Sequence, residues 1–186
     1  IGRDAGSELF VTADNCTDLT ALRAAEAGAT VLIRNDSTQT GKSAALRFAF
    51  GELSPKDFDG YLILDADSSV DSELIESVRN RLAFGAAAVQ CRNVVSNSEE
   101  SPRTALLAVA LTAFNGVRPR GRARWGLSAG PLANGFAVRC DTLSLVPFAA
   151  NSIVEDLEYQ LLLVDYGLSV EFADEAAVQS PMPSLG

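Results

Sequence analysis

The chain has 186 residues, of which 47% are hydrophobic, a composition typical of one globular domain with a sizeable core. Its net charge of -9 argues against nucleic acid as a partner, and no apolar run is long enough to span a bilayer. The absence of histidine excludes Ser-His and Cys-His catalysis and every histidine-based metal site. Acid–base chemistry therefore falls to Asp, Glu, Lys, Tyr or Cys, and a metal ion must be bound by oxygen ligands.

The first half of the chain predicts alternating strands and helices. Short apolar runs indicate strands at 9–13, 30–33, 61–64 and 86–91. Capping residues and helical spacing indicate helices at 19–27, 41–50 and 71–82, and the apolar face of the second is Ala44, Ala45, Phe48 and Ala49. This alternation predicts right-handed βαβ units, and hence an α/β fold with a mostly parallel sheet flanked by helices.

The second half of the chain is less regular. Its predicted elements are an Ala/Leu-rich helix at 103–115, a strand at 136–139, a helix at 152–167 and a strand at 170–173. Between the first two lies the stretch 117–126, in which Pro119 and Gly121 predict a loop. Arginines occupy positions 118, 120, 122 and 124 of this stretch. They favour a solvated surface, with binding of an anionic lipid or ligand as the alternative.

Three cysteines, Cys16, Cys91 and Cys140, are far apart in the sequence and form no CxxC pair. Such spacing is typical of reduced thiols rather than of a disulfide framework or a zinc site. We therefore expect a cytoplasmic protein.

The segment Asp65-Ala66-Asp67 directly follows the predicted strand 61–64. In an open α/β sheet the carboxyl ends of the strands are where ligands bind, and two carboxylates there repel each other unless a cation lies beside them. Three interpretations follow: a divalent-cation site for a diphosphate, a haloacid-dehalogenase-type nucleophile, or acids that only cap the next helix. The dehalogenase interpretation is disfavoured because that family carries its element on the first strand, and two predicted strands come earlier here.

A second element, Thr40-Gly41-Lys42-Ser43, resembles the end of a phosphate-binding P-loop, with the strand before Asp65 as its Walker B strand. The first glycine of that pattern would fall at Asp36, whose side chain and negative charge oppose phosphate binding. Two alternatives are a plain helix start with Lys42 exposed, and a helix N-terminus from which Lys42 assists a phosphate-bearing ligand.

Two further elements carry polar groups. Glu155, Asp156 and Glu158 lie in the first turns of the helix predicted at 152–167, where acids are common for structural reasons alone. Beside a cation site they would also supply a spare carboxylate that could act as a base. Asn134 and Gly135 precede the strand 136–139, as in an ordinary turn.

Taken in order, these elements resemble the family-2 inverting glycosyltransferases, which have a GT-A fold. The matching segments are V-T-A-D-N-C-T-D at 11–18, G-K-S-A-A-L at 41–46, D-A-D at 65–67, A-N-G at 133–135 and E-D at 155–156. Two of them are similar to the bacterial, membrane-linked, cellulose- and hyaluronan-synthase-like subset. The resemblance implies a GT-A-type nucleotide-diphospho-sugar transferase fold in one domain, 1–186, with a nucleotide-binding half at 1–95 and an acceptor-side half at 96–186.

The resemblance also implies an activity, which is metal-dependent inverting transfer of a sugar from a nucleotide-diphosphate sugar. The donor would be a UDP-sugar, and the acceptor a hydroxyl group of a carbohydrate or lipid. On the donor side, the nucleobase would contact Asp14, the nucleotide Lys42, the ribose or diphosphate Asp65, and Mg²⁺ or Mn²⁺ Asp67. The general base would be Asp156, and the acceptor side would include Asn134, Gly135 and Glu155.

The sequence departs from the family pattern at both ends. No strand of the type V-x-V-I-P-x-x-N-E precedes Leu9, and the chain stops about where the family's Q-x-x-R-W element begins. We therefore expect a core that lacks both ends, with contact to the inner face of the cell membrane only through other segments of a longer parent. The alternatives are a P-loop-like nucleotide-hydrolysing or phosphotransfer enzyme, and a degenerate GT-A binding module without activity.

Overall fold

The structure is a computed structural model that describes residues 6–54, 58–70, 72–130, 134–149 and 154–184. The chain divides into a small unit, Gly2–Asp57 with Phe148–Glu155, and a large unit, Phe58–Pro147 with Asp156–Gly186. The predicted helix starts at Asp71 and Ser152, and Ala133 of the A-N-G turn, lie outside the described residues. The single domain 1–186 with halves 1–95 and 96–186 stays a prediction.

The small unit alternates strands and helices as the sequence predicts. Its elements are β1 (Phe10–Asp14), α1 (Thr20–Glu26), β2 (Thr30–Arg34) and α2 (Lys42–Leu53). The two strands are parallel, and their register places Asp14 opposite Arg34 at the carboxyl ends. On the predicted apolar face of α2, Ala44 and Ala49 are buried, whereas Ala45 and Phe48 are half-buried.

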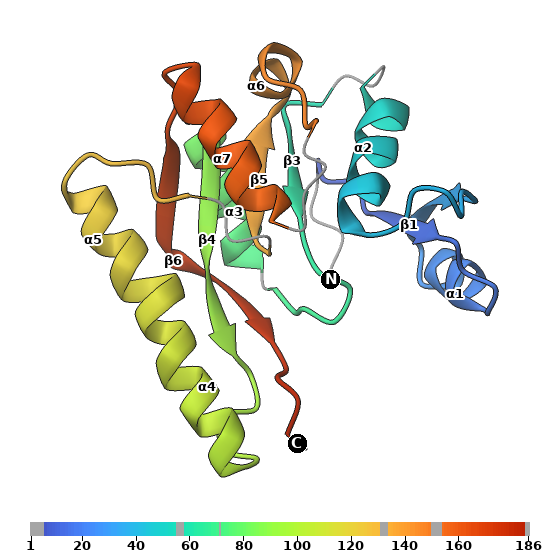
Figure 1. Cartoon of the computed structure of the whole chain (residues 1–186). Helices are drawn as coiled ribbons and strands as arrows, with labels where there is room; N and C mark the ends of the chain where they lie inside the picture. Colours follow the sequence, from blue (N-terminus) through green and yellow to red (C-terminus); the bar gives the residue numbers. More distant parts are fainter. Residues whose placement is uncertain (1–5, 55–57, 71, 131–133, 150–153, 185–186) are drawn as a thin grey trace. The chain divides into compact units, whose positions relative to one another are not determined.

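The large unit is built on a four-stranded sheet (Figure 1). Its strands are β3 (Gly60–Ile63), β4 (Ala88–Val95), β5 (Phe136–Arg139) and β6 (Val170–Ser180). In the order β3-β5-β4-β6, β4 and β6 are parallel and β5 is antiparallel to both of its neighbours. Three of the four strands therefore run in one direction, as a mostly parallel sheet requires, but the antiparallel β5 lies between β3 and β4 and makes the sheet mixed.

Helices cover both faces of this sheet, with α3 (Ser72–Ala83) behind it and α7 (Glu155–Asp165) in front in Figure 1. Residues Leu74, Val78 and Leu82 recur at helical spacing on α3 and pack in one buried cluster with Ala137 of β5. The preceding residue in β5, Phe136, points to the opposite face of the sheet because side chains alternate along a strand. There its ring meets the ring of Tyr159 on α7 at a centroid distance of 6.0 Å.

The prediction of a loop at 117–126 is wrong, because the chain there is helical. One helical run comprises α4 (Pro102–Thr112), a π-helical turn η1 (Ala113–Val117) and α5 (Arg118–Arg124). In the π turn Arg118 N–H donates to the carbonyl of Ala113, five residues earlier. This wider turn accommodates the Pro119 ring, which in a regular helix meets the carbonyl four residues before it.

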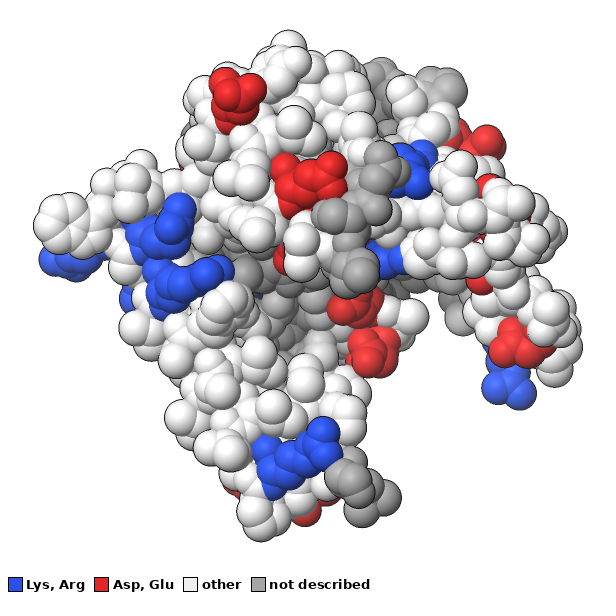
Figure 2. All heavy atoms as spheres, viewed as in Figure 1, with Lys and Arg blue, Asp and Glu red and all other residues white. Residues whose placement is uncertain are grey.

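An ion pair and a hydrogen bond also hold α5 in place. Arg120 binds Asp174 through two hydrogen bonds of 2.6 and 2.7 Å, and Arg122 donates to the Ser128 carbonyl. Basic side chains gather over the place of α5 in Figure 2, which has the same view as Figure 1. Asp174 is 54 positions from Arg120, so the local Pro and Gly signals favoured a loop.

Strand β6 is longer than the predicted 170–173, and it contains a bulge. Cys91 of β4 pairs with Ala173, but the next residue, Arg92, pairs with Ala177, so 174–176 bulge out of the ladder. A short helix, α6 (Cys140–Leu145), was also not predicted. Within the described residues, none of the helices has the length and apolar character needed to cross a bilayer.

Candidate functional site

The acidic segment after β3 forms a tight turn whose backbone is held from outside. Within the turn, Ser68 N–H donates to the Asp65 carbonyl at 3.0 Å. Asn134, just before β5, accepts a hydrogen bond from Asp65 N–H through its side-chain oxygen at 3.0 Å. Its amide nitrogen donates to Ser68 Oγ at 2.8 Å and to Ser180 Oγ, at the end of β6, at 3.0 Å. The structure thus brings together two predicted elements, the D-A-D turn and Asn134.

The two carboxylates of the turn differ in exposure. Asp65 is half-buried and Asp67 is exposed. Among the described residues, nothing forms a hydrogen bond or ion pair with the Asp67 side chain, and no three acidic or cysteine side chains gather as a complete metal cage. A cation bound here would therefore take most of its ligands from a diphosphate and water, which is how Mg²⁺ is commonly bound in phosphate-transfer sites. The oxygen donors of the turn fit Mg²⁺ or Mn²⁺.

A second layer of hydrogen bonds fixes the Asn134-Gly135 turn itself. Gly135 has φ = +71° and its N–H donates to the Ile63 carbonyl at 3.0 Å. Gln90, which is fully buried in β4, donates from Nε2 to the Asn134 carbonyl at 2.8 Å. Sequence reasoning missed Gln90 and Ser180. A lone glutamine inside an apolar strand was the available signal for Gln90, since a buried amide needs partners.

Asp14 lies in the small unit, within a cluster of charges at the ends of β1 and β2. Arg34 is only 7% exposed, and its guanidinium binds Asp14 at 2.6 Å and Asp36 at 3.0 Å. Asn15, at φ = +52°, joins the same cluster by accepting from Asp36 N–H and donating to the Asp36 carbonyl. The sequence predicted Asp14 as a site residue but missed Arg34, because their pairing depends on the strand register.

Lys42 is the first residue of α2, after Gly41 at φ = +99°. The loop before it does not form a phosphate cradle. Asp36 instead accepts hydrogen bonds from both the N–H and the hydroxyl of Thr38, so its carboxylate shapes the turn and occupies an amide. Those bonds also lower the pKa of the Asp36 carboxyl. An ionised carboxylate at this position opposes phosphate binding and argues against the P-loop interpretation.

Glu155 and Asp156 begin α7, and both are half-buried. Asp156 Oδ1 accepts from Leu157 N–H at 2.8 Å. The helix is anchored one turn later, where the buried Tyr159 hydroxyl donates to the Val146 carbonyl at 2.9 Å. Among the described residues, no hydrogen bond or ion pair joins Asp156 to Asp65, Asp67 or Asn134. Asp156, the predicted base, is therefore held in the first turn of α7, and none of the described contacts links it directly to the acidic turn.

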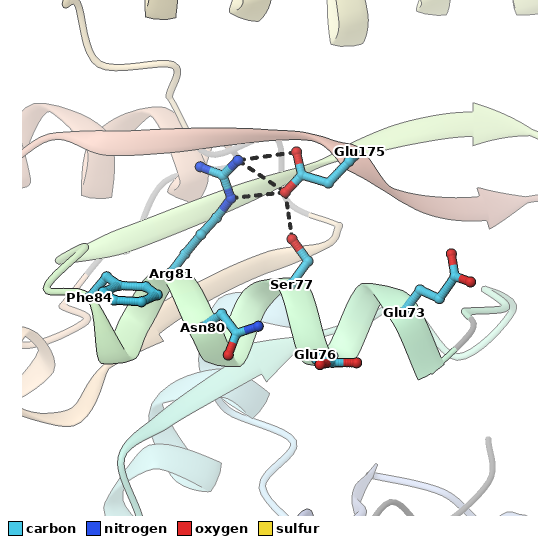
Figure 3. A pocket seen from close by; sticks show the side chains of 7 residues that line it. All are labelled: Glu73, Glu76, Ser77, Asn80, Arg81, Phe84 and Glu175. Atoms are coloured by element: carbon cyan, nitrogen blue, oxygen red, sulfur yellow. Dashed lines mark hydrogen bonds and ion pairs between the residues drawn. The ribbon is translucent and has the colours of Figure 1, made fainter.

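An open hollow of about 440 Å³ lies elsewhere in the large unit, between α3 and β6 (Figure 3). None of the predicted site residues lines it. The bulge of β6 supplies Glu175, which accepts two hydrogen bonds from Arg81 and one from Ser77, both on α3. The neighbouring bulge residue, Asp174, holds α5 through Arg120. The bulge thus joins the sheet to two helices, because each of its two carboxylates forms an ion pair with an arginine of one helix.

Glu175→Gln is expected to reduce the loss of stability in acid. Burial raises the pKa of Glu175, but hydrogen bonds from Ser77 and Arg81 and the Arg81 charge outweigh it, so the pKa lies below its usual 4.5. A carboxyl with a lowered folded-state pKa contributes stability above its unfolded pKa and loses it as pH falls through the folded value. Urea midpoints measured from neutral to acidic pH should therefore fall less in Glu175→Gln. Glu76→Gln, which also lines the hollow and has no ion pair among the described residues, should follow the wild type.

Solved structures share this architecture. A mycobacterial protein aligns with 94% of this chain and 55% of its own, at a TM-score of 0.58 and 22% identity. Glucosyl-3-phosphoglycerate synthase from Mycobacterium tuberculosis was solved with Mn²⁺, UDP and phosphoglyceric acid. It gives a TM-score of 0.54 and 22% identity, and the alignment covers 89% of this chain and 56% of that protein. Mannosyl-3-phosphoglycerate synthase from Rubrobacter xylanophilus gives a TM-score of 0.57 and 21% identity, and the alignment covers 97% of this chain and 57% of that protein.

These likenesses show that the chain has a GT-A-type α/β fold, the fold of those glycosyltransferases, and so confirm the predicted fold class. The chain spans 55–57% of the length of these solved structures. No protein-family model and no curated protein matches the sequence.

Proposed function

We propose that this domain transfers a sugar from a nucleotide-diphosphate sugar, with UDP as the nucleotide, to an acceptor hydroxyl with inversion. The observation that carries the proposal is the D-A-D turn at the carboxyl end of β3, with its backbone held by Asn134 and the Asp67 carboxylate exposed. Ligands bind at strand ends of this kind in α/β folds. Further support comes from the shared fold, since one protein that has it was solved with Mn²⁺ and UDP.

On the donor side, four residues have proposed roles. Asp67 binds Mg²⁺ or Mn²⁺, which neutralises charge on the leaving diphosphate. Asp65 faces the ribose or diphosphate, Asp14 contacts the nucleobase and Lys42 lies near the nucleotide. Arg34 already binds Asp14 Oδ1 at 2.6 Å. This contact orients the Asp14 carboxylate and leaves its second oxygen for the nucleobase.

On the acceptor side, Asp156 deprotonates the attacking hydroxyl, and inversion needs only this one carboxylate. Glu155 and Gly135 are proposed to lie near the acceptor. The acceptor is a carbohydrate or lipid, and no nucleic acid takes part. Membership of family 2, its cellulose- and hyaluronan-synthase-like subset, and a cytoplasmic location at the membrane of a longer parent are part of the same proposal.

A thermal-shift screen tests the donor site. We expect UDP with Mn²⁺ to raise the melting temperature, because a ligand that binds only the folded state stabilises it. UDP without metal should raise it less. A shift with ATP and Mg²⁺ but not with UDP would favour the phosphotransfer alternative, and no shift with any nucleoside diphosphate would favour a binding module without activity.

Asp156→Asn is expected to retain UDP binding but to lose transfer by about 10²- to 10⁴-fold, the usual contribution of a general base. Donor binding is measured by calorimetry, and transfer by release of UDP from the UDP-sugar with an acceptor found active for the wild type. Asp165→Asn, at the other end of α7, is the matched control and should keep both properties. Parallel loss of donor binding and transfer in Asp156→Asn would contradict the role of base.

A further inference from the structure

The Asn134 side chain faces inward and uses both of its amide hydrogens within the protein. Only 7% of the residue is exposed. One amide hydrogen goes to Ser68 Oγ and the other to Ser180 Oγ, while the side-chain oxygen accepts from Asp65 N–H. A side chain engaged in this way has no donor left for an acceptor hydroxyl, and the three groups it binds lie in or beside the acidic turn.

The same amide joins three segments that are far apart in sequence. Asp65 and Ser68 bound the turn after β3, Asn134 precedes β5, and Ser180 ends β6. The two serine hydroxyls also bind each other at 2.8 Å, which closes the network around the amide. Each polar atom of this network has at least one partner, and such a network favours one conformation of the turn.

The backbone of Asn134 is itself held by a buried glutamine. Gln90 is 0% exposed, and its Nε2 reaches the Asn134 carbonyl at 2.8 Å and the Gly135 carbonyl at 3.3 Å. Gly135 also has no room for a side chain, because a Cβ there would lie 2.7 Å from Val178 Cγ2 and 3.1 Å from Cys91 Cβ. The backbone that carries Asn134 is therefore fixed from both sides.

We propose that Asn134 is a positioning residue for the metal–diphosphate side of the site and not an acceptor contact. It holds the turn from Asp65 to Ser68 in the conformation that presents the Asp67 carboxylate, and Ser180 anchors that arrangement to the end of β6. The ligand part of this proposal rests on the proposed function. The conformational part does not, because it concerns the turn alone. Partners that orient a metal ligand commonly affect metal affinity by about 10- to 100-fold.

Hydrogen exchange of the ligand-free protein tests the conformational part. Asn134→Ala removes the acceptor of Asp65 N–H, so exchange in the peptide covering 64–69 should become about tenfold faster or more. Thr104→Ala is the control: Thr104 is also buried and belongs to the capping box of α4 in the same unit, but it does not touch the turn. Ser180→Ala removes one acceptor of the Asn134 amide and the hydrogen-bond partner of the Ser68 hydroxyl, and it serves in place of Asn134→Ala if that variant does not fold. Exchange in 64–69 that rises no more than in Thr104→Ala overturns the proposal.

Calorimetry of UDP with Mn²⁺, without any acceptor, tests the ligand part. We expect Asn134→Ala to weaken metal-dependent UDP binding by about 10- to 100-fold and Thr104→Ala to leave it unchanged. An acceptor contact would have no effect in this assay, so unchanged affinity in Asn134→Ala overturns the positioning role. If the wild type binds no UDP with Mn²⁺, the proposed function fails and the exchange result alone decides whether Asn134 positions the turn.

Discussion

Replacing Arg34 by methionine is expected to lower the free energy of unfolding by about 3 kcal/mol. Arg34 is 7% exposed and its guanidinium binds both Asp14 and Asp36, so its removal leaves two carboxylates without their cation. Breaking a buried ion pair from one side costs about 3–5 kcal/mol, and the lower end applies because the Asp36 side chain is 36% exposed and can be hydrated.

Urea denaturation of Arg34→Met measures this loss. Arg23→Met, on the exposed surface of α1 in the same unit, is the matched control and should change the free energy by no more than about 0.5 kcal/mol. If both variants unfold at the wild-type midpoint, the Arg34 cluster does not stabilise the small unit as described.

Gly135→Ala is expected to be strongly destabilising. Its φ of +71° costs a non-glycine residue about 1–2 kcal/mol, and the added Cβ would lie 2.7 Å from Val178 Cγ2 in a packed core. Overpacking adds about 1–3 kcal/mol, for a total of about 2–5 kcal/mol.

Gly126→Ala separates these two causes. Gly126 has a similar φ of +68°, but a Cβ there meets nothing within 4 Å. It should therefore show the backbone cost alone, about 1–2 kcal/mol, in the same urea experiment. Equal losses in the two variants would mean that the close approach of Gly135 to Val178 and Cys91 carries no energetic weight.

Local patterns in the sequence were enough for the fold and for the position of the acidic turn. Apolar runs of strand length placed β1 to β5 to within a few residues, and the run before Asp65 located the carboxylates at a strand end. These signals are local, because strand length and helical spacing follow from side chains near each other in the chain. Glycosyltransferase structures with the same fold then confirmed the fold class.

The parts that the sequence did not predict depend on contacts between distant residues. Pro119 and Gly121 indicate a loop locally, but the ion pair of Arg120 with Asp174 holds that stretch as a helix. Likewise, nothing near Asn134 in sequence shows that its amide reaches Ser180, 46 positions later. The bulge of β6 is similar, since the register shift is set by its pairing with β4.

The central claim is that the D-A-D turn binds a nucleoside diphosphate through a divalent cation. Calorimetric titration of UDP, with and without Mn²⁺, tests it most directly in the wild type, Asp67→Ala and Asp59→Ala. Asp59 is the matched control because it is also exposed but lies just before the other end of β3. We predict Mn²⁺-dependent binding in the wild type and Asp59→Ala, and its loss in Asp67→Ala. Binding of UDP that is independent of Mn²⁺, or that survives unchanged in Asp67→Ala, would contradict the claim.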